Sequence, residues 1–266
     1  MKMSPSTYYY VSSVAEQADA ELRIEIESVI DLLPDSGYRS VTAKLREKMR
    51  INPKRVLRVM RKYNLLCRKS RKFSVKTTQS GHKLQKFPNL VKDLIVEQPA
   101  QVLVGDVTAF DIRGKDHYLA LLTDLFTREN VGMAISDKND TVLVLACLND
   151  AASHPSGIRG AIHHSDADVR YCSAAYVMRA SELGLTMSMT VGNVYENAHA
   201  ESLNKTFKRQ EINVNEYPNK HGAAESLFRF KQIYNTERPH SSLGNLPPAV
   251  FRRNFEAKNS KRGLQF

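Results

Sequence analysis

The sequence predicts an α/β protein in which an all-α module precedes a larger, mixed β-sheet flanked by helices. Three observations predict this class: helical spacing of apolar residues in the first quarter of the chain, strand-like alternation after residue 98, and a length of 266 residues, which exceeds one average domain. Hydrophobic residues make up 42% of the chain and charged residues 25%, a composition typical of globular proteins with a sizeable core.

Composition also excludes several classes of protein. No apolar run approaches the roughly 20 residues that a bilayer span needs, so we expect no membrane partner. The first residues, MKMSPSTYYYVSS, lack the apolar segment of a signal peptide, and the three cysteines are scattered at Cys67, Cys147 and Cys172. We therefore expect a cytoplasmic protein with neither a disulfide scaffold nor a structural zinc site.

The positive charge is concentrated in one segment. The chain carries a net charge of +11 at pH 7, of which residues 1–37 contribute −5, residues 38–92 contribute +17 and residues 93–266 contribute −1. Like charges at this density repel unless a polyanion neutralises them, and phosphate contacts supply the sequence-independent part of DNA affinity. Residues 38–92 are therefore predicted to bind nucleic acid. The alternative is a solvated basic surface.

Three helices are predicted in the first module. An acidic helix spans 21–33, a second helix spans 40–49, and a third begins after Asn52, a typical cap, with Pro53 at its first position. The last two are joined by about three residues, which indicates a helix-turn-helix unit whose second helix enters a DNA groove. The basic residues expected to face DNA are Lys54, Arg55, Arg58, Arg61 and Lys62.

Residues 67–97 are predicted to form a basic linker, because they are rich in Lys, Ser, Thr and Gln and show little apolar periodicity. The linker either follows a DNA backbone or is a plain spacer. The next elements are expected in the order strand 101–112, strand 117–126, strand 130–136, helix 141–153 (capped by Asp140 or Thr141), strand 157–164, helix 173–184, strand 185–189, and helices 198–210 and 222–235.

This order describes a mixed sheet flanked by helices, the arrangement of ribonuclease H-like cores. We therefore predict a helix-turn-helix module over 1–66, the linker over 67–97, a catalytic core over 98–255 and a basic tail over 256–266.

Three carboxylates lie where structure alone gives them little reason to be. Asp106 interrupts an apolar strand, Asp166 follows the end of another, and Glu201 lies on a helix after a Gly-Asn loop. Acids from two strands and a facing helix can converge on hard divalent cations, which prefer oxygen ligands. Two such ions, about 4 Å apart, can stabilise both the attacking and the leaving oxygen in phosphodiester chemistry.

Five ordered motifs then indicate a family. They are GDVT (105–108), HYLALLTDLFTR (117–128), HSDADVRY (164–171), GNVYENAHAES (192–202) and YNTERPHSSLGNLPPAVF (234–251). Together with SGYRSVTAKLREK and NPKRVLRVMRKYNLL, they resemble the second-reading-frame (OrfB) transposases of bacterial insertion sequences. These proteins combine a helix-turn-helix with a ribonuclease H-like core similar to that of retroviral integrases, and the resemblance covers residues 36–252.

The resemblance implies an enzyme that binds the ends of its mobile element and a target DNA, and that cleaves and joins strands with two Mg²⁺ or Mn²⁺ ions. Asp106, Asp166 and Glu201 match the DDE triad, the family's catalytic metal ligands, and Lys208 matches a DNA-contacting lysine. Arg238, in the last motif, could reach a phosphate. A homo-oligomer on DNA, association with the bacterial nucleoid and a first-frame partner protein are also implied.

A catalytically inactive DNA-binding relic, or a repressor of transposition, is the alternative function. Retention of all three acids and Lys208 argues against it.

The sequence departs from the family pattern at three places. Leu103 stands where the family usually has tryptophan, Ala167-Asp168 replaces the usual Gln-Gly and adds a carboxylate beside the site, and 34 residues instead of 35 separate Asp166 from Glu201.

Two further features have competing interpretations. His163 and His164 could bind a metal but suit a structural role better, and Asp124 either supports the site or caps a turn.

Overall fold

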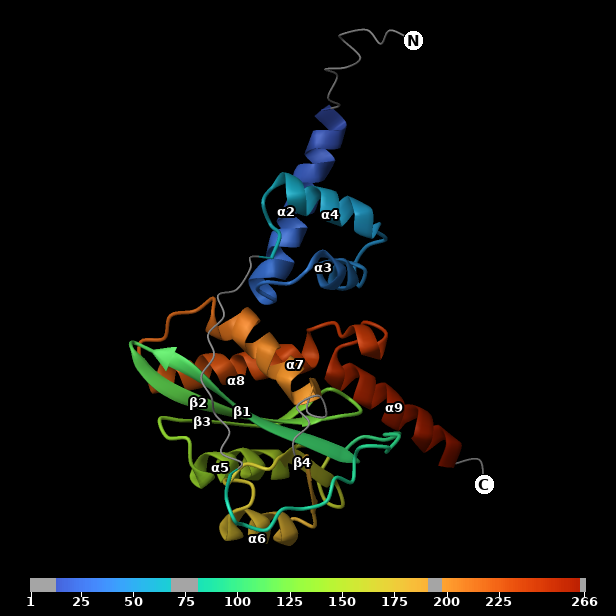
Figure 1. The fold of residues 1–266 in the computed structure, drawn as a ribbon. Coiled ribbons are helices and arrows are strands. Elements are labelled where there is room, and N and C mark those ends of the chain that lie inside the picture. Colours follow the sequence, from blue (N-terminus) through green and yellow to red (C-terminus); the bar gives the residue numbers. More distant parts are fainter. Residues whose placement is uncertain (1–12, 68–80, 191–197, 264–266) are drawn as a thin grey trace. The chain divides into compact units, whose positions relative to one another are not determined.

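The computed structural model describes residues 13–67, 81–190 and 198–263 (Figure 1). The chain divides into two compact units, residues 1–69 and residues 70–266. Within the described ranges, no helix has both the length and the apolar character that crossing a bilayer requires.

In the described part of the first unit, three helices form a bundle: α2 (Ser13–Leu32), α3 (Tyr38–Leu45) and α4 (Pro53–Lys62). The Asn52 side chain accepts a hydrogen bond from the Lys54 amide at 2.9 Å, so the expected cap of α4 is confirmed. Helix α3 ends at Leu45, earlier than predicted, and residues 46–49 continue as hydrogen-bonded turns. The shared core contains Leu22, Ile26, Val29, Val41, Leu45, Ile51, Val56, Val59 and Met60.

The second unit contains a five-stranded sheet with the order β3-β2-β1-β4-β5. Strands β1 (Val102–Ile112), β2 (Lys115–Asp124) and β3 (Asn130–Ser136) form the predicted antiparallel meander. Strands β4 (Ile162–Asp166) and β5 (Thr186–Thr190) extend the sheet beyond β1 in parallel. This mixed topology, covered by helices on both faces, is the ribonuclease H-like fold that the sequence predicts.

Two apolar cores lie on opposite faces of the sheet, as Figure 1 shows by the helices that cover them. Helices α5 (Thr141–Ala152) and α6 (Ala174–Glu182) cover one face, and α7 (Ala198–Phe207) and α8 (Lys220–Thr236) cover the other. Helix α5 packs closely on β3, because a Cβ at Gly132 would lie 2.5 Å from the Cys147 carbonyl oxygen. The strand therefore needs glycine at this position.

In the second unit, the structure also differs from the sequence prediction, most clearly at β4, α7 and α9. Strand β4 begins at Ile162 and includes Asp166 as its last residue, because residues 157–160 form a turn with positive φ at Gly157 and Gly160. Helix α7 changes to a π-helical turn over Lys208–Ile212. Helix α9 (Pro248–Gly263) continues into the expected tail, so residues 256–263 belong to a helix.

Candidate active site

Strands β1 and β4 bring Asp106 and Asp166 together. Val102, Leu103 and Val104 pair in parallel with Ile162, His163 and His164. Continuing this register by two residues brings Asp106 opposite Asp166, and the pleat directs both side chains to the same face of the sheet. Phe110 and Ile112 of β1 have side chains on the same face of the sheet as Asp106, and they pack under α7 and α8. The two carboxylates therefore lie on the face that α7 covers.

Helix α7 adds Asn204 and Glu201 to this face. The Asn204 Nδ2 donates a hydrogen bond to Asp106 Oδ2 at 2.6 Å, and Glu201 lies one helical turn earlier on the same side of the helix. The other Asp106 oxygen accepts a hydrogen bond from the Val107 amide at 2.8 Å. Asn204 Oδ1 is buried without a hydrogen-bond partner, whereas Glu201 is partly exposed and lies 3.4 Å from the Lys205 ammonium.

Asp166 and Glu201 both lie within electrostatic range of Asp106. Burial, followed by repulsion from Asp166 and then from Glu201, raises the pKa of Asp106 to about 7, although the hydrogen bonds from Val107 and Asn204 oppose this shift. Burial and the two neighbouring carboxylates thus disfavour the charged form of Asp106.

Lys208 lies beside the acids at the first residue of the π-helical turn. Burial lowers its pKa, and the nearby Asp106 carboxylate partly offsets this effect. The helix is not a regular α-helix at Lys208, yet the lysine lies within electrostatic range of Asp106.

The oxygen-rich donor set fits a hard divalent cation better than any other ligand, because excess carboxylate charge and an unpartnered amide oxygen both favour a cation. The described residues do not bring three acidic, His or Cys side chains into one preformed cluster that could hold a metal ion. Ligation by Asp106, Asp166 and Glu201 therefore stays a prediction.

The two histidines next to Asp166 are structural. His163 is fully buried, its Nε2 lies 2.9 Å from the Tyr176 hydroxyl, and burial lowers its pKa to about 4. His164 is also buried, with its Nδ1 2.9 Å from Ser188 Oγ. A Cβ at Gly105, the residue before Asp106, would lie 3.3 Å from both His163 Nε2 and the Tyr171 hydroxyl. This glycine lets β1 lie directly over the buried rings.

Asp168 does not add a free carboxylate to the site, contrary to our expectation from the sequence. It is buried, and its Oδ1 accepts hydrogen bonds from both the amide and the Nε of Arg170, the latter at 2.5 Å. Arg170 also bonds to Asn139. Asp124, for which two roles were open, caps the turn after β2: its carboxylate accepts from the amides of Phe126, Thr127 and Ala100.

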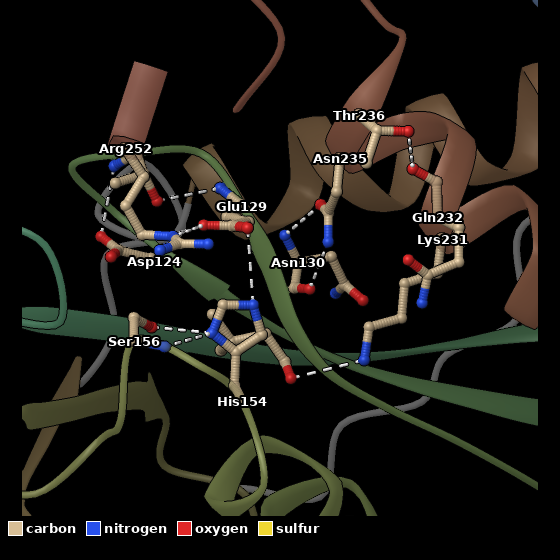
Figure 2. Close-up of polar contacts among 12 residues, drawn as sticks. Asp124, Glu129, Asn130, His154, Ser156, Lys231, Gln232, Asn235, Thr236 and Arg252 are labelled. Atoms are coloured by element: carbon tan, nitrogen blue, oxygen red, sulfur yellow. Dashed lines mark hydrogen bonds and ion pairs between the residues drawn. The ribbon is translucent and has the colours of Figure 1, made fainter. Parts of the chain in front are cut away.

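The C-terminal motif mainly holds the fold together. The Asn235 side chain bonds to both the amide and the carbonyl of Asn130, at 2.9 and 3.0 Å, as if it were another strand residue (Figure 2). Arg238 donates from Nε to Gln210 Oε1 at 2.9 Å and lies over the Tyr234 ring. A protein contact thus already occupies one edge of the Arg238 guanidinium, which the sequence assigned to DNA.

A buried charged network joins α9 to the sheet, and no local pattern in the sequence indicates it. Figure 2 shows Glu129 between His154 and Arg252; its carboxylate lies 2.8 Å from Arg252 Nε and 3.5 Å from His154 Nε2. Hydrogen bonds from these two partners lower the pKa of Glu129 against the opposing effect of burial. Phe126 contacts the rings of Phe251 and Phe255 on the same helix.

In the first unit, the predicted DNA-contacting residues of α4 fall into two groups. Both Nη atoms of Arg58 donate to the buried carboxylate of Asp19 at 2.7 Å, Lys62 lies 3.4 Å from the same carboxylate, and Arg55 donates to the Ala18 carbonyl. Lys54 and Arg61 are exposed and have no ion pair in the part of the chain that the structure describes. An open hollow of about 810 Å³, lined by Arg46, Arg50 and Asn52, adjoins the start of α4.

Comparisons with known proteins agree with this architecture. Models of the integrase core domain match residues 96–192 and 184–248, and a model of the HTH-like domain matches residues 16–73. The chain is 32% identical to the insertion element IS600 uncharacterized 31 kDa protein of Shigella sonnei, over 95% of this chain and 96% of that protein. It is 31% identical to the transposase for insertion sequence element IS629 of the same organism, over 97% and 90%.

A solved structure shows the same fold at much lower identity. A chain of the simian T-cell lymphotropic virus intasome, solved in complex with PP2A regulatory subunit B56 gamma, has a TM-score of 0.50 and 13% identity over 82% of this chain and 70% of that one. The helix-turn-helix and integrase-core matches follow the order of the two units in the structure, and the two relatives match over nearly their whole length. The chain therefore belongs to the family of bacterial insertion-sequence transposases of the second-frame type.

Proposed function

We propose that this chain is a DNA transposase that binds the ends of its mobile element and uses Asp106, Asp166 and Glu201 for metal-dependent strand cleavage and strand transfer. One observation carries the proposal: acids from β1, β4 and α7 act on one another strongly enough that Asp166 and Glu201 both raise the pKa of Asp106. Excess negative charge of this kind, on a sheet face of an integrase core, favours a catalytic cation site.

Asp106, Asp166 and Glu201 would hold Mg²⁺ or Mn²⁺, and two ions, when bound, would supply positive charge to the attacking and leaving oxygens of a phosphodiester. The chain itself would orient the groups. Asn204 fixes one Asp106 oxygen, and the Lys208 ammonium, beside the acids, is positioned to attract a non-bridging phosphate oxygen.

The reaction that we propose is an in-line displacement at phosphorus by water or by a DNA 3′-hydroxyl. The 3′-oxygen of the broken bond leaves with the electron pair and becomes a 3′-hydroxyl, while the phosphorus stays on the 5′-oxygen and gains the attacking oxygen. No protein side chain becomes bonded to DNA, so no serine or tyrosine is needed as a nucleophile.

Lys54 and Arg61 are the residues of α4 that we propose contact DNA directly, because their cationic groups are exposed and free of ion pairs in the described structure. Arg55, Arg58 and Lys62 would have to exchange contacts with α2 for phosphate contacts, and Arg238 would use the guanidinium N–H groups that do not face Gln210. We further propose a homo-oligomer on paired DNA ends in the nucleoid, with the first-frame product of the element as a possible partner.

The test is cleavage of a duplex that carries the element's own terminal sequence. The full chain should nick this DNA in Mg²⁺ but not in EDTA, and Asp166→Asn should abolish nicking. Asp116→Asn, an exposed aspartate on β2, is the matched control and should cleave like wild type. If the wild-type chain binds the duplex but never nicks it, the inactive relic or repressor is the better description.

A further inference from the structure

The second half of the predicted linker is attached to the catalytic unit, and it passes beside the acidic site. Residues 81–97 contain no helix or strand, yet they lie in the same compact unit as the sheet (teal in Figure 1). We call residues 81–90 the strap. Its contacts bear on the two interpretations that the sequence left open for this segment, a plain spacer or a DNA-following segment.

The strap is fixed to the sheet edge at three points. The Met189 amide of β5 donates to the Pro88 carbonyl at 3.3 Å, the Leu90 amide donates to Ser188 Oγ at 2.9 Å, and Phe87 packs against the core under α5 and α6. Strand β5 is the last strand of the sheet, so the strap partly covers an edge whose N–H and C=O groups need partners. A plain spacer would not need these contacts.

The start of the strap lies next to Asp166. His82 Nε2 is 3.0 Å from the carbonyl oxygen of Ala167, the residue that directly follows Asp166, and the Leu84 amide donates to His82 Nδ1 at 3.2 Å. The Leu84 contact makes Nδ1 an acceptor, so Nε2 carries the proton and donates to Ala167. The imidazole is thus held from both sides at the end of β4.

Two exposed lysines accompany this attachment. Lys83 and Lys86 are solvent-exposed and form no ion pair within the residues that the structure describes. Lys86 and Asp166 both lie close enough to the Cys172 thiol to influence its pKa, in opposite directions. Lys86 therefore lies near the loop after β4, and Lys83 directly follows His82, which contacts that loop, so a polyanion that approached Asp166 would come near both.

We propose that the strap forms one wall of the DNA-binding groove at the catalytic site, with Lys83 and Lys86 contacting backbone phosphates on either side of the reacting one. The inference rests on the proposed function, since it assumes that DNA reaches Asp106 and Asp166. It assigns to these two lysines a positioning role that the helix-turn-helix unit does not supply. His82 acts through the backbone, because its hydrogen bond to Ala167 fixes the strap at the end of β4.

Lysine footprinting of the full chain tests the proposal. The protein is acetylated with and without a duplex of the element's terminal sequence, with Ca²⁺ in place of Mg²⁺, and each lysine is followed by mass spectrometry. DNA should protect Lys83 and Lys86. It should not protect Lys138, which follows β3 at the opposite edge of the sheet, or Lys220, which pairs with Asp137 beside it. Equal reactivity of Lys83 and Lys86 with and without DNA would overturn the proposal.

A second measurement uses the salt dependence of binding to the same duplex. The double variant Lys83→Ala/Lys86→Ala should reduce the slope of log affinity against log salt by about 1.8, the value for two phosphate contacts. At about 0.1 M salt, this change in slope corresponds to roughly 60-fold weaker binding of the duplex. The matched control Lys138→Ala/Lys220→Ala should keep the wild-type slope. An unchanged slope in both variants would make the strap a spacer.

His82 variants separate attachment from charge. His82→Ala should reduce protection of both lysines, whereas His82→Gln, whose amide can donate to the Ala167 carbonyl, should restore it. Protection that persists in His82→Ala would refute the role of His82. None of these readouts needs catalysis, so wild-type chain that protects its lysines without nicking would refute the proposed function alone.

Discussion

Replacing Asp106 by asparagine should stabilise the metal-free protein above neutral pH, because it removes a buried charge that two other carboxylates repel. The pKa of Asp106 is about 7 in the folded protein, against an ordinary value of 3.8. A difference of about 3 pKa units, at 1.36 kcal/mol each, corresponds to about 4 kcal/mol of lost stability at pH 8.

Part of this gain is lost because asparagine must arrange its hydrogen bonds differently from the carboxylate. Its Oδ1 can keep the bond from the Val107 amide, and its Nδ2 can donate to Asn204 once the Asn204 amide rotates. That rotation uses the Asn204 oxygen that is buried without a partner in the wild type. The pKa of about 7 already includes the two hydrogen bonds to the carboxylate, so only the amide rotation and the imperfect fit of asparagine are subtracted; at a cost of about 1–2 kcal/mol, they leave a net gain of about 2–3 kcal/mol.

The gain depends on pH with a definite sign. Because the folded-state pKa of Asp106 lies above the unfolded one, the folded wild type binds the proton more tightly, and its stability falls as pH rises from about 4 to about 7. The advantage of Asp106→Asn should therefore be largest near pH 8 and vanish near pH 4. A unit of this size gains about 2–4 °C in melting temperature per kcal/mol, so we expect a shift of about 4–12 °C at pH 8.

The assay is thermal melting of the full chain in EDTA at pH 4, 6 and 8, followed by a titration with Mg²⁺. Wild type should gain about 2.7 kcal/mol at a hundredfold excess of Mg²⁺ over Kd, and Asp106→Asn should gain less because it lacks a ligand. The control Asp116→Asn should change stability by no more than about 0.5 kcal/mol. If Asp106→Asn melted at or below wild type in EDTA at pH 8, or if its shift did not vary with pH, our account of the site's charge would be wrong.

Three further predictions concern other parts of the molecule. Arg58→Ala should destabilise the first unit by about 1–3 kcal/mol, because it leaves the buried Asp19 carboxylate with only the more distant Lys62 as a cationic partner. The control Arg61→Ala should leave the melting temperature unchanged but weaken DNA binding in a titration. Arg58 also lowers the pKa of Asp19, so its contribution is present above pH 3.8 and is lost as pH falls below that value; acid unfolding of Arg58→Ala should show less of this loss. Gly105→Ala should destabilise the catalytic unit by about 1–3 kcal/mol, since the new methyl group would press on His163 and Tyr171, while Gly81→Ala, with open space around it, should melt like wild type. Asn204→Leu should raise the pKa of Asp106 further and so increase the Mg²⁺ concentration that half-maximal cleavage requires; an unchanged Mg²⁺ dependence would show that Asn204 does not orient Asp106.

The elements that the sequence predicted best are those with strong local signals. Asn52 and Pro53 begin α4 as expected, Asp140 caps α5, and the strand 130–136 has the predicted bounds. Local patterns decide such features because caps and alternation depend on neighbours in the chain. That Asp106 and Asp166 lie near each other could be predicted from the order of the strands, since β1 and β4 are adjacent in this topology.

The features that the sequence did not predict depend on distant contacts. Asp19 lies far from Arg58 in the chain, so no local pattern indicated that the ion pair would form. Asp168 was expected to be a free carboxylate because nothing in the sequence shows which way the Arg170 side chain turns. Helix α9 has little apolar periodicity, and contacts of Arg252 with Glu129 and of Phe255 with Phe126 hold it instead.

The most direct test of the central claim, that Asp106, Asp166 and Glu201 together hold the catalytic ions, is anomalous diffraction from crystals of the protein soaked in Mn²⁺. We predict one or two anomalous peaks within coordination distance of carboxylate oxygens from all three residues, and no peak at this position in crystals of Asp166→Asn. Mn²⁺ bound elsewhere in wild-type crystals, with the three carboxylates not coordinating it, would contradict the account.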